Sequence, residues 1–300
     1  MTRMKVAPRH RHCEEAEGRR SNLRSEIASA LPGMLPRNDV GFACGNDRIM
    51  KKINLEELNK RFEKAQPQEI LNWAISEFHS KITLTSSFQT ESIVLLDMVS
   101  KIDQSIPILF LETGWHFPET VAFKNEVIKQ LGLKNVIDLK ADQEKREKFN
   151  KETNNKPYEV NPDYCCQINK VDPLDQAIEG YDAWISGIRR SQSKTRKDIK
   201  IIEEYQNGMF KINPLANVTS GDIWWYIKEH NLPKHPLFEK GYLSIGCWPC
   251  TKPVQPGDDE RSGRWAGREK TECGIHTFMK LKPVKTSAET PEEKQEGSNI

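Results

Sequence analysis

The sequence predicts an α/β fold, in which a parallel β-sheet with flanking helices is followed by an irregular C-terminal segment. Two observations predict it. Short apolar or β-branched runs alternate with amphipathic stretches through the middle of the chain, joined by short connections. From residue 233 onward Pro and Gly become frequent and regular patterning thins. A chain of 300 residues is long enough to build one such domain around a large core.

The expected helices and strands follow one another in order. Asn54 is an expected N-cap, because Leu55, Leu58 and Phe62 behind it share one helical face. Pro67 fits the first turn of a second helix. Strands are expected at 81–86, 106–111, 136–139, 183–186 and 210–213. Further helices are expected at 93–99, 118–131, 142–152 and 221–229. This alternation is typical of a parallel sheet with helices on both faces.

Composition and charge exclude several classes of protein. No run of about 18 apolar residues occurs, so no membrane span is expected. The first 49 residues carry nine Lys or Arg and six Asp or Glu, a net charge of +3, which leaves −1 on the remainder. The body therefore lacks the basic surface of a nucleic-acid-binding protein. Seven cysteines, partly adjacent or in CxxC spacing, fit a reducing compartment, and we expect a cytoplasmic protein.

Three parts are expected along the chain. Residues 1–49 show no sustained helical or strand period and are predicted to be a disordered extension. Patterning begins at Met50, which we expect to be the natural start, with the leader non-native. Residues 50–282 form the expected domain, and the polar, charged residues 283–300 a flexible tail.

Four of the cysteines form two distant pairs. Cys165 and Cys166 are adjacent, and Cys247 and Cys250 form a CxxC pair that follows after 80 intervening residues. Thiolates select iron–sulfur clusters or zinc. Adjacent cysteines are less expected for structural zinc, whose ligands are usually spaced by two to four residues. The pattern favours an iron–sulfur cluster, with a four-thiolate zinc site or a vicinal disulfide beside buried thiols as alternatives.

Two polar turns follow neighbouring expected strands. The turn 85–92 (Thr-Ser-Ser-Phe-Gln-Thr-Glu-Ser) lies between a strand and a helix, where backbone N–H groups can hold a phosphate, although an ordinary capped turn would have the same spacing. The stretch 111–114 (Leu-Glu-Thr-Gly) ends the next strand at the same sheet edge. Because ligands bind at this edge in doubly wound sheets, the two turns together favour a nucleotide site.

Cations and one further cysteine lie near the paired cysteines in sequence. The cations are Lys170, Arg189, Arg190, Arg196, Arg261 and Arg264. A charge run is often only a solvated face, but this set also suits a sulfate or phosphate. Cys273, three residues before His276, lies in a polar, Gly-containing segment. A lone cysteine can be a buried small hydrophobe, whereas a neighbouring cation would make it a candidate nucleophile.

As a set, these motifs resemble assimilatory adenylyl-sulfate reductases of the phosphoadenylyl-sulfate reductase family. The resemblance spans roughly residues 55–278. It rests on Cys165-Cys-Gln-Ile-Asn-Lys170, Gly187-Ile-Arg-Arg-Ser-Gln-Ser, Cys247-Trp-Pro-Cys-Thr-Lys-Pro-Val, Gly263-Arg-Trp and Glu272-Cys-Gly-Ile-His276.

The resemblance implies a fold, a cofactor and a reaction. The fold is the PP-loop (adenine nucleotide alpha hydrolase-like) fold, the substrate is adenosine 5′-phosphosulfate, and the implied pathway is sulfate assimilation toward cysteine. Cys273 would attack the sulfate sulfur, release AMP and carry an S-sulfonate, from which a thioredoxin or glutaredoxin-type reductant frees sulfite. The implied ligands of a [4Fe–4S] cluster are Cys165, Cys166, Cys247 and Cys250. The implied substrate contacts are Lys170, Arg196, Arg261, Arg264 and His276 around the phosphosulfate, and Ser86, Leu111 and Gly187 around the nucleotide.

The sequence departs from the family pattern in one motif. The PP-loop pattern SGGxDS stands here as Ser87-Phe-Gln-Thr-Glu-Ser92, with both glycines replaced, which argues against an ATP-cleaving enzyme. Alternatives are a reductase of phosphoadenylyl sulfate, an iron–sulfur RNA sulfurtransferase, or a zinc-stapled nucleotide-binding protein. The two cysteine pairs disfavour the first, and the net charge of −1 disfavours the second. The sequence is compatible with a homo-oligomer.

Overall fold

The computed structural model describes residues 53–205, 208–255, 257–270 and 272–275. All of them belong to one compact unit, Lys52–Ile300. The expected N-terminal extension, the expected start at Met50 and the expected tail at 283–300 lie outside the described residues. Within the described ranges, none of the helices combines the length and apolar character that crossing a membrane requires.

A six-stranded sheet with the order β3-β2-β1-β4-β6-β5 forms the centre of the described unit. Its strands are β1 (Ile82–Thr85), β2 (Ile108–Glu112), β3 (Val136–Lys140), β4 (Ala183–Ile185), β5 (Ile202–Glu204) and β6 (Phe210–Ile212). All neighbours are parallel except β5 and β6. The five expected strands are confirmed. The expected parallel sheet is confirmed, and it carries one additional antiparallel edge strand, β5, which the sequence did not indicate because Ile202 is its only apolar residue.

The strand order places a ligand crevice next to β1. After β1 the chain adds β2 and β3 on one side, and then returns to place β4 on the other side. In open α/β sheets, ligands bind outside the carboxyl ends of the strands at such a switch point. The turns that begin at Ser86, after β1, and at Ser186, after β4, meet this crevice.

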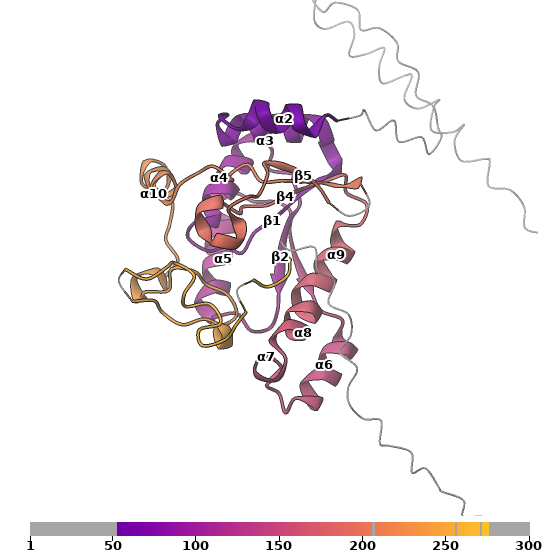
Figure 1. Ribbon diagram of the computed structural model, residues 1–300, viewed down its shortest axis with the longest axis vertical. Helices are drawn as coiled ribbons and strands as arrows, with labels where there is room; N and C mark the ends of the chain where they lie inside the picture. Colours follow the sequence, from indigo (N-terminus) through magenta and orange to yellow (C-terminus); the bar gives the residue numbers. More distant parts are fainter. Residues whose placement is uncertain (1–52, 206–207, 256, 271, 276–300) are drawn as a thin grey trace, which may run out of the picture. The chain divides into compact units, whose positions relative to one another are not determined.

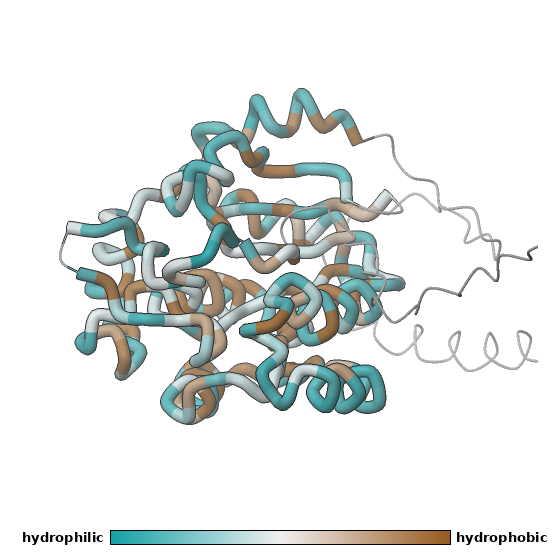
Figure 2. Tube along the Cα trace, turned by 60° about the horizontal axis from the view of Figure 1, so that its bottom comes forward, coloured by the Kyte–Doolittle hydropathy of each residue, from teal (hydrophilic) through white to brown (hydrophobic). Residues whose placement is uncertain are grey.

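Helices cover both faces of the sheet (Figure 1). They are α2 (Leu55–Phe62), α3 (Pro67–Phe78), α4 (Ser92–Ile102), α5 (Pro118–Leu131), α6 (Gln143–Glu152), α7 (Pro157–Val160), α8 (Pro162–Cys166), α9 (Asp172–Ile178) and α10 (Ser220–Glu229). The expected helix starts are confirmed: the Asn54 side chain accepts a hydrogen bond from Glu57 N at 3.2 Å, and Pro67 opens α3. Polar and apolar residues alternate along α2, at the top of Figure 2, as expected for an amphipathic helix.

Two apolar clusters hold the layers together. Side chains at Leu84, Ile108 and Ile185 pack with α3, α4 and α5 on one face. Leu109 and Trp184, their neighbours along the strands, point to the other face and pack with α9. This two-residue alternation along parallel strands explains why both faces of the sheet are buried.

The helical region around the adjacent cysteines contains an irregular turn. The helix α8 ends at Cys166, and the next five residues, Gln167–Val171, form a π-helical turn that leads into α9. Such turns are rare and often occur at functional sites. Lys170 lies within this turn.

The described residues after α10 contain only short 3₁₀ turns, as expected for the irregular C-terminal segment. Backbone hydrogen bonds between distant residues hold the segment. Lys252 N donates to Gly263 O, and Trp265 N donates to Cys250 O, both at 2.9 Å. Gly263 permits this approach, because a Cβ there would lie 2.1 Å from Lys252 O.

Candidate active site

A pocket of about 200 Å³ opens at the carboxyl ends of β1, β2 and β4. We call it the main pocket. Ser86 follows β1, Leu111 lies at the end of β2 and Gly187 follows β4, and all three line it. The structure therefore brings together the three residues that the sequence assigned to a nucleotide, at the switch point of the sheet.

The turn after β1 is held by side chains instead of glycines. Gln89 N donates to Ser92 Oγ at 2.7 Å, and Phe88 N donates to Ser86 Oγ at 3.1 Å. The Gln89 side chain bonds to the backbone of Ile245, which also lines the pocket: its Oε1 accepts from Ile245 N at 2.8 Å and its Nε2 donates to Ile245 O. Gln89, which sequence analysis recognised only as a lost glycine, thus ties the turn to the C-terminal segment.

Four cations line the main pocket together with Cys273. We call the four the cation cluster: Lys170, Arg196, Arg261 and Arg264. Lys170 comes from the π-helical turn and Arg196 from the 3₁₀ turn Lys194–Arg196. Although distant in sequence, all four line the same pocket as Cys273, and this assembly is suited to bind an anion next to a thiol.

Arg264 is positioned by a glycine and a tryptophan. Its guanidinium lies 4.4 Å from the Trp265 ring centroid, and Nη1 donates to Ile245 O at 3.3 Å. A Cβ on Gly246 would lie 2.3 Å from Arg264 Nη2, so this arrangement requires glycine at 246. Arg264 Nε is buried without a hydrogen-bond partner among the described residues.

Glu272 is paired with two members of the cation cluster. Arg196 donates to it through Nε and Nη2, both at 2.8 Å, and Arg261 through Nη2 at 3.2 Å. Thr195 Oγ1 adds a hydrogen bond at 3.3 Å. Although burial alone would raise the pKa of Glu272, the hydrogen bonds and charges of these arginines lower it below its ordinary value. Glu272 is therefore ionised at neutral pH. In the sequence, Glu272 stands out only as the first residue of the motif around Cys273, with no role assigned to it.

A second, smaller cavity is lined by Cys165, Cys166, Cys247 and Cys250. We call it the cysteine cavity. The fold thus brings together two cysteine pairs that are separated by 80 residues in the sequence. The first pair ends α8, and the second lies at the 3₁₀ turn Trp248–Cys250, which is held by a hydrogen bond of 2.8 Å from Trp248 N to Trp115 O.

The four thiols are free; Cys165 and Cys166 are buried, and Cys247 and Cys250 are half-buried. Burial raises the pKa of Cys165 to about 12, with a further contribution from the neighbouring thiols, and the pKa of Cys166 to about 11. Within the described ranges, no three His, Cys, Asp or Glu side chains are arranged to hold a metal ion. A single zinc ion would draw its thiolates to about 3.8 Å from one another, given Zn–S bonds of about 2.3 Å.

Lys170 lines both the main pocket and the cysteine cavity. Although burial alone would lower the pKa of Lys170, its electrostatic interaction with the thiolate forms of Cys247, Cys166 and Cys273 raises it above its ordinary value. The ammonium group lies where it can act on the thiols and on an anion in the main pocket.

The comparisons with known proteins agree with this geometry. Residues 81–253 match the phosphoadenosine phosphosulfate reductase domain. The chain belongs to this reductase family. A phosphoadenosine 5′-phosphosulfate reductase of Gloeobacter violaceus is 45% identical over 231 residues, which are 75% of this chain and 94% of the relative. An adenosine 5′-phosphosulfate reductase of Bacillus subtilis is 40% identical over 232 residues, covering 77% of this chain and 95% of the relative.

A solved reductase has the same fold. The phosphoadenylyl-sulfate reductase from Candida auris, in a phosphate complex, matches with a TM-score of 0.57 and 32% identity over 65% of this chain and 94% of its own. The expectation of the PP-loop fold for this reductase family member is therefore confirmed. The departures in the turn after β1 leave the fold intact.

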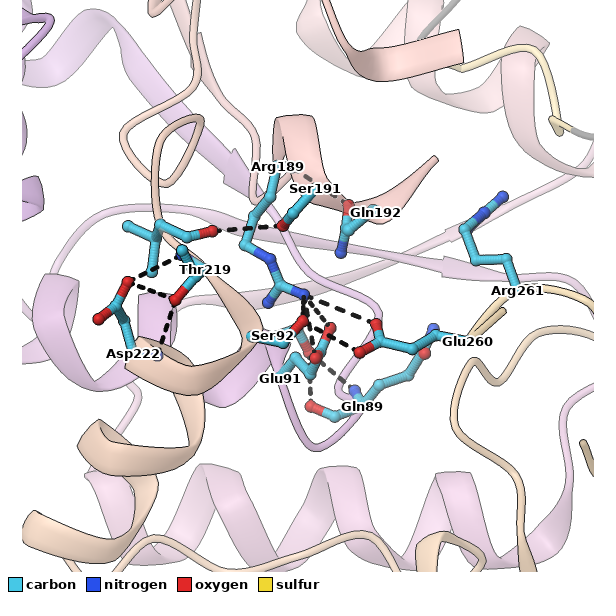
Figure 3. Close-up of polar contacts among 12 residues, drawn as sticks. Gln89, Glu91, Ser92, Arg189, Ser191, Gln192, Thr219, Asp222, Glu260 and Arg261 are labelled. Carbon is cyan, nitrogen blue, oxygen red and sulfur yellow. Dashed lines mark hydrogen bonds and ion pairs between the residues drawn. The ribbon is translucent and has the colours of Figure 1, made fainter. Parts of the chain in front are cut away.

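Two of the six cations have other partners in this family member. Arg189 is only 1% exposed, and its Nη2 bonds both carboxylate oxygens of Glu91, at 2.9 and 3.0 Å, with Glu260 3.8 Å away (Figure 3). Arg189, Glu91 and Glu260 also line the main pocket, and nothing in the sequence indicated that the two carboxylates pair with Arg189. Arg190 instead pairs with Glu63, at 2.6 Å, and does not line the pocket. Both arginines, which the sequence left open between a solvated face and an anion site, are thus each paired with a carboxylate of the chain. His276 lies outside the described residues.

Proposed function

We propose that this protein reduces adenosine 5′-phosphosulfate to sulfite and AMP in assimilatory sulfate reduction. One observation carries the proposal: the thiol of Cys273 lines the same pocket as the cation cluster and the turn after β1. A pocket for an adenine nucleotide, an anion site and a nucleophile are the three parts that this reaction requires. The names of the relatives support the same reaction class.

In the first half-reaction, the Cys273 thiolate attacks the sulfate sulfur. The bond from sulfur to the bridging oxygen breaks, its electron pair leaves with AMP, and Cys273 becomes an S-sulfocysteine. A thiolate approaching a phosphosulfate faces charge repulsion, which Lys170, Arg196, Arg261 and Arg264 offset, and they stabilise the charge that develops on the leaving phosphate. We place the nucleotide against Ser86, Leu111 and Gly187.

In the second half-reaction, an external dithiol of the thioredoxin or glutaredoxin type supplies two electrons. Its first thiolate attacks the Cys273 sulfur and expels sulfite, which leaves a mixed disulfide. Its second thiol then attacks this disulfide and restores Cys273, so the reductant leaves oxidised. We expect this chemistry in the cytoplasm, where dithiol reductants are kept reduced.

We propose that Cys165, Cys166, Cys247 and Cys250 hold a [4Fe–4S] cluster. The donor set supports it, since four free thiols line one cavity and the described lining residues include no carboxylate or imidazole. When bound, the cluster would supply local negative charge and order the two cysteine segments. Lys170, at the boundary of the two cavities, would be held in place by this charge and directed toward the phosphosulfate.

Phosphoadenylyl sulfate is the second candidate substrate, because the Gloeobacter relative carries its name. The residues of the pocket favour the substrate without the extra phosphate. Glu91 and Glu260 share the single charge of Arg189, so we expect excess negative charge where these three residues line the pocket. An additional phosphate would be repelled there.

Mass spectrometry of the protein mixed with adenosine 5′-phosphosulfate, without reductant, tests the proposal. We expect one SO₃ adduct on Cys273 and stoichiometric AMP. Cys273→Ser should give neither, and phosphoadenylyl sulfate should label more slowly. An adduct elsewhere, or none, would refute the assigned nucleophile. Iron and sulfide analysis after anaerobic purification separates the cluster from zinc: a colourless, iron-free but active protein would exclude the cluster.

A further inference from the structure

A carboxylate from the chain itself occupies donors of the main pocket that are best suited to an anion. Glu272 accepts from the Nε and Nη2 edge of Arg196, both at 2.8 Å, and from Arg261. The Glu272 and Arg196 side chains are each only 9% exposed, so this pair is shielded from solvent. Paired, charge-assisted hydrogen bonds of this kind are among the strongest in proteins.

A sulfate or phosphate would use the same donors. The fork of a guanidinium binds a carboxylate and a phosphate in the same way, through two parallel N–H groups. The other terminal nitrogen of Arg196, Nη1, donates to Gln192 Oε1. Both forks of Arg196 are therefore engaged before any ligand arrives, and an incoming anion has to displace Glu272 to use the Nε edge.

Glu272 also relieves repulsion within the cation cluster. Burial, with added repulsion from Arg196 and Arg264, lowers the pKa of Arg261 to about 10, and the negative charge of Glu272 opposes this shift. Without Glu272 and without a bound anion, the mutual repulsion of the four buried or half-buried cations would not be offset. Glu272 thus has the charge and the position of a bound substrate anion.

We propose that Glu272 is an internal substitute for the phosphosulfate, which holds Arg196 and Arg261 in the free protein and is displaced when substrate binds. This inference rests on the proposed function. Glu272 directly precedes Cys273, so its displacement releases the segment that carries the nucleophile. Substrate binding thereby frees Cys273 to reach the sulfate sulfur.

Calorimetric titration with ADP tests the proposal on the complete protein with its metal content intact. ADP carries a phosphate in place of the sulfate and has no sulfonyl group to transfer. Glu272→Gln keeps the shape of the side chain and removes its charge, so it should bind ADP roughly tenfold more tightly than the natural protein. Glu269→Gln, which removes an equally negative but exposed carboxylate three residues away, should leave ADP binding unchanged. Unchanged or weaker binding of ADP by Glu272→Gln overturns the proposal.

A titration with adenosine distinguishes competition between Glu272 and the anion of the ligand from a change in the shape of the pocket. Adenosine carries no anion, so its affinity should be the same in Glu272→Gln and in the natural protein. An equal gain for adenosine and ADP would mean that the substitution reshapes the pocket, and would overturn the proposal.

Hydrogen exchange of the natural protein supplies a second test that needs no variant. Saturating ADP should speed amide exchange in residues 272–275, whereas slower exchange overturns the proposal. Failure of this inference is distinct from failure of the proposed function. If the natural protein binds ADP and forms the Cys273 adduct, but Glu272→Gln does not bind ADP more tightly, only the role of Glu272 is wrong.

Discussion

The side-chain amide of Gln89 pairs with both backbone groups of Ile245, 156 residues later in the chain. Gln89 belongs to the turn after β1, and Ile245 lies two residues before Cys247. This pair therefore fixes the C-terminal segment, with its CxxC turn, against the turn proposed to hold the nucleotide. It replaces the flexibility of a glycine-rich loop with a specific contact between two segments.

Removal of the Gln89 amide should loosen this connection. Gln89→Ala loses two hydrogen bonds at a part-buried site, each worth about 1 kcal/mol, so we expect a loss of roughly 2 kcal/mol in the free energy of unfolding. KM for adenosine 5′-phosphosulfate should rise as well. Urea titration and steady-state kinetics measure both quantities. Gln104→Ala, at an exposed position, is the matched control, and identical behaviour of the two variants would contradict this role.

A methyl group at position 246 should displace Arg264. In Gly246→Ala the new Cβ would lie 2.3 Å from Arg264 Nη2, so the guanidinium has to move. Loss of one charged contact to the phosphosulfate is worth about 1.5–3 kcal/mol, and kcat/KM should fall roughly 10- to 100-fold. Gly221→Ala is the control, because its Cβ would have ordinary contacts, with Thr219 Oγ1 at 3.6 Å. Full activity in Gly246→Ala would argue against the placement of Arg264.

Replacement of Lys170 should slow the chemical step and leave the metal content of the protein unchanged. Lys170→Ala removes the cation that lines both cavities, and we expect kcat to fall about 10²- to 10³-fold, the range for one lost electrostatic contact in a transition state. Iron content should remain. Lys148→Ala, at an exposed position, should behave like the natural protein. Full turnover in Lys170→Ala would contradict the role assigned to the ammonium group.

Metal content should depend on the cysteine cavity and not on the nucleophile. Cys250→Ala should lose iron and sulfide and melt at a lower temperature, because bound metal stabilises the folded state. Cys273→Ala should keep both iron and thermal stability while losing all activity. Iron and sulfide assays with thermal melts decide the matter. A Cys250→Ala protein with full iron content would remove this residue from the ligand set.

A buried histidine should make the protein sensitive to mild acid. His235 is completely buried; its Nδ1 accepts from Leu237 N at 3.2 Å, and its Nε2 lies 3.0 Å from Thr120 Oγ1. Burial lowers the pKa of His235 to about 4, from an ordinary value near 6.5. Its contribution to stability is therefore complete above about pH 6.5 and is lost as the pH falls toward 4.

As the pH falls from 6.5 to 5, this residue should lower the free energy of unfolding by about 2 kcal/mol, at about 1.36 kcal/mol per pH unit. In His235→Gln, which cannot take up a proton, that part of the pH dependence should vanish. Urea titrations of both proteins at the two pH values measure the difference. Parallel losses in the two proteins would show that His235 is not the group that titrates.

Local patterns predicted most of the regular structure. Helical periodicity and caps identified the starts of α2 and α3, and apolar runs identified every strand except β5. That strand depends on pairing with β6, where Ile202 aligns with Ile212, so its stability comes from a neighbour and not from its own residues. The short helices α7, α8 and α9 were also missed, because the segment around the adjacent cysteines carries no regular period.

The sequence by itself determined the inventory of the site: the paired cysteines, the cations, Cys273 and the turn after β1 are recognisable from residue types and spacing. Only the tertiary structure decided how the charges pair. In the folded chain Arg196 pairs with Glu272, Arg189 with Glu91 and Arg190 with Glu63, and the partners are 76, 98 and 127 residues apart in the sequence. An ion pair between distant residues leaves no periodic trace in a sequence, because any carboxylate could serve. Burial in the folded chain selects the partner.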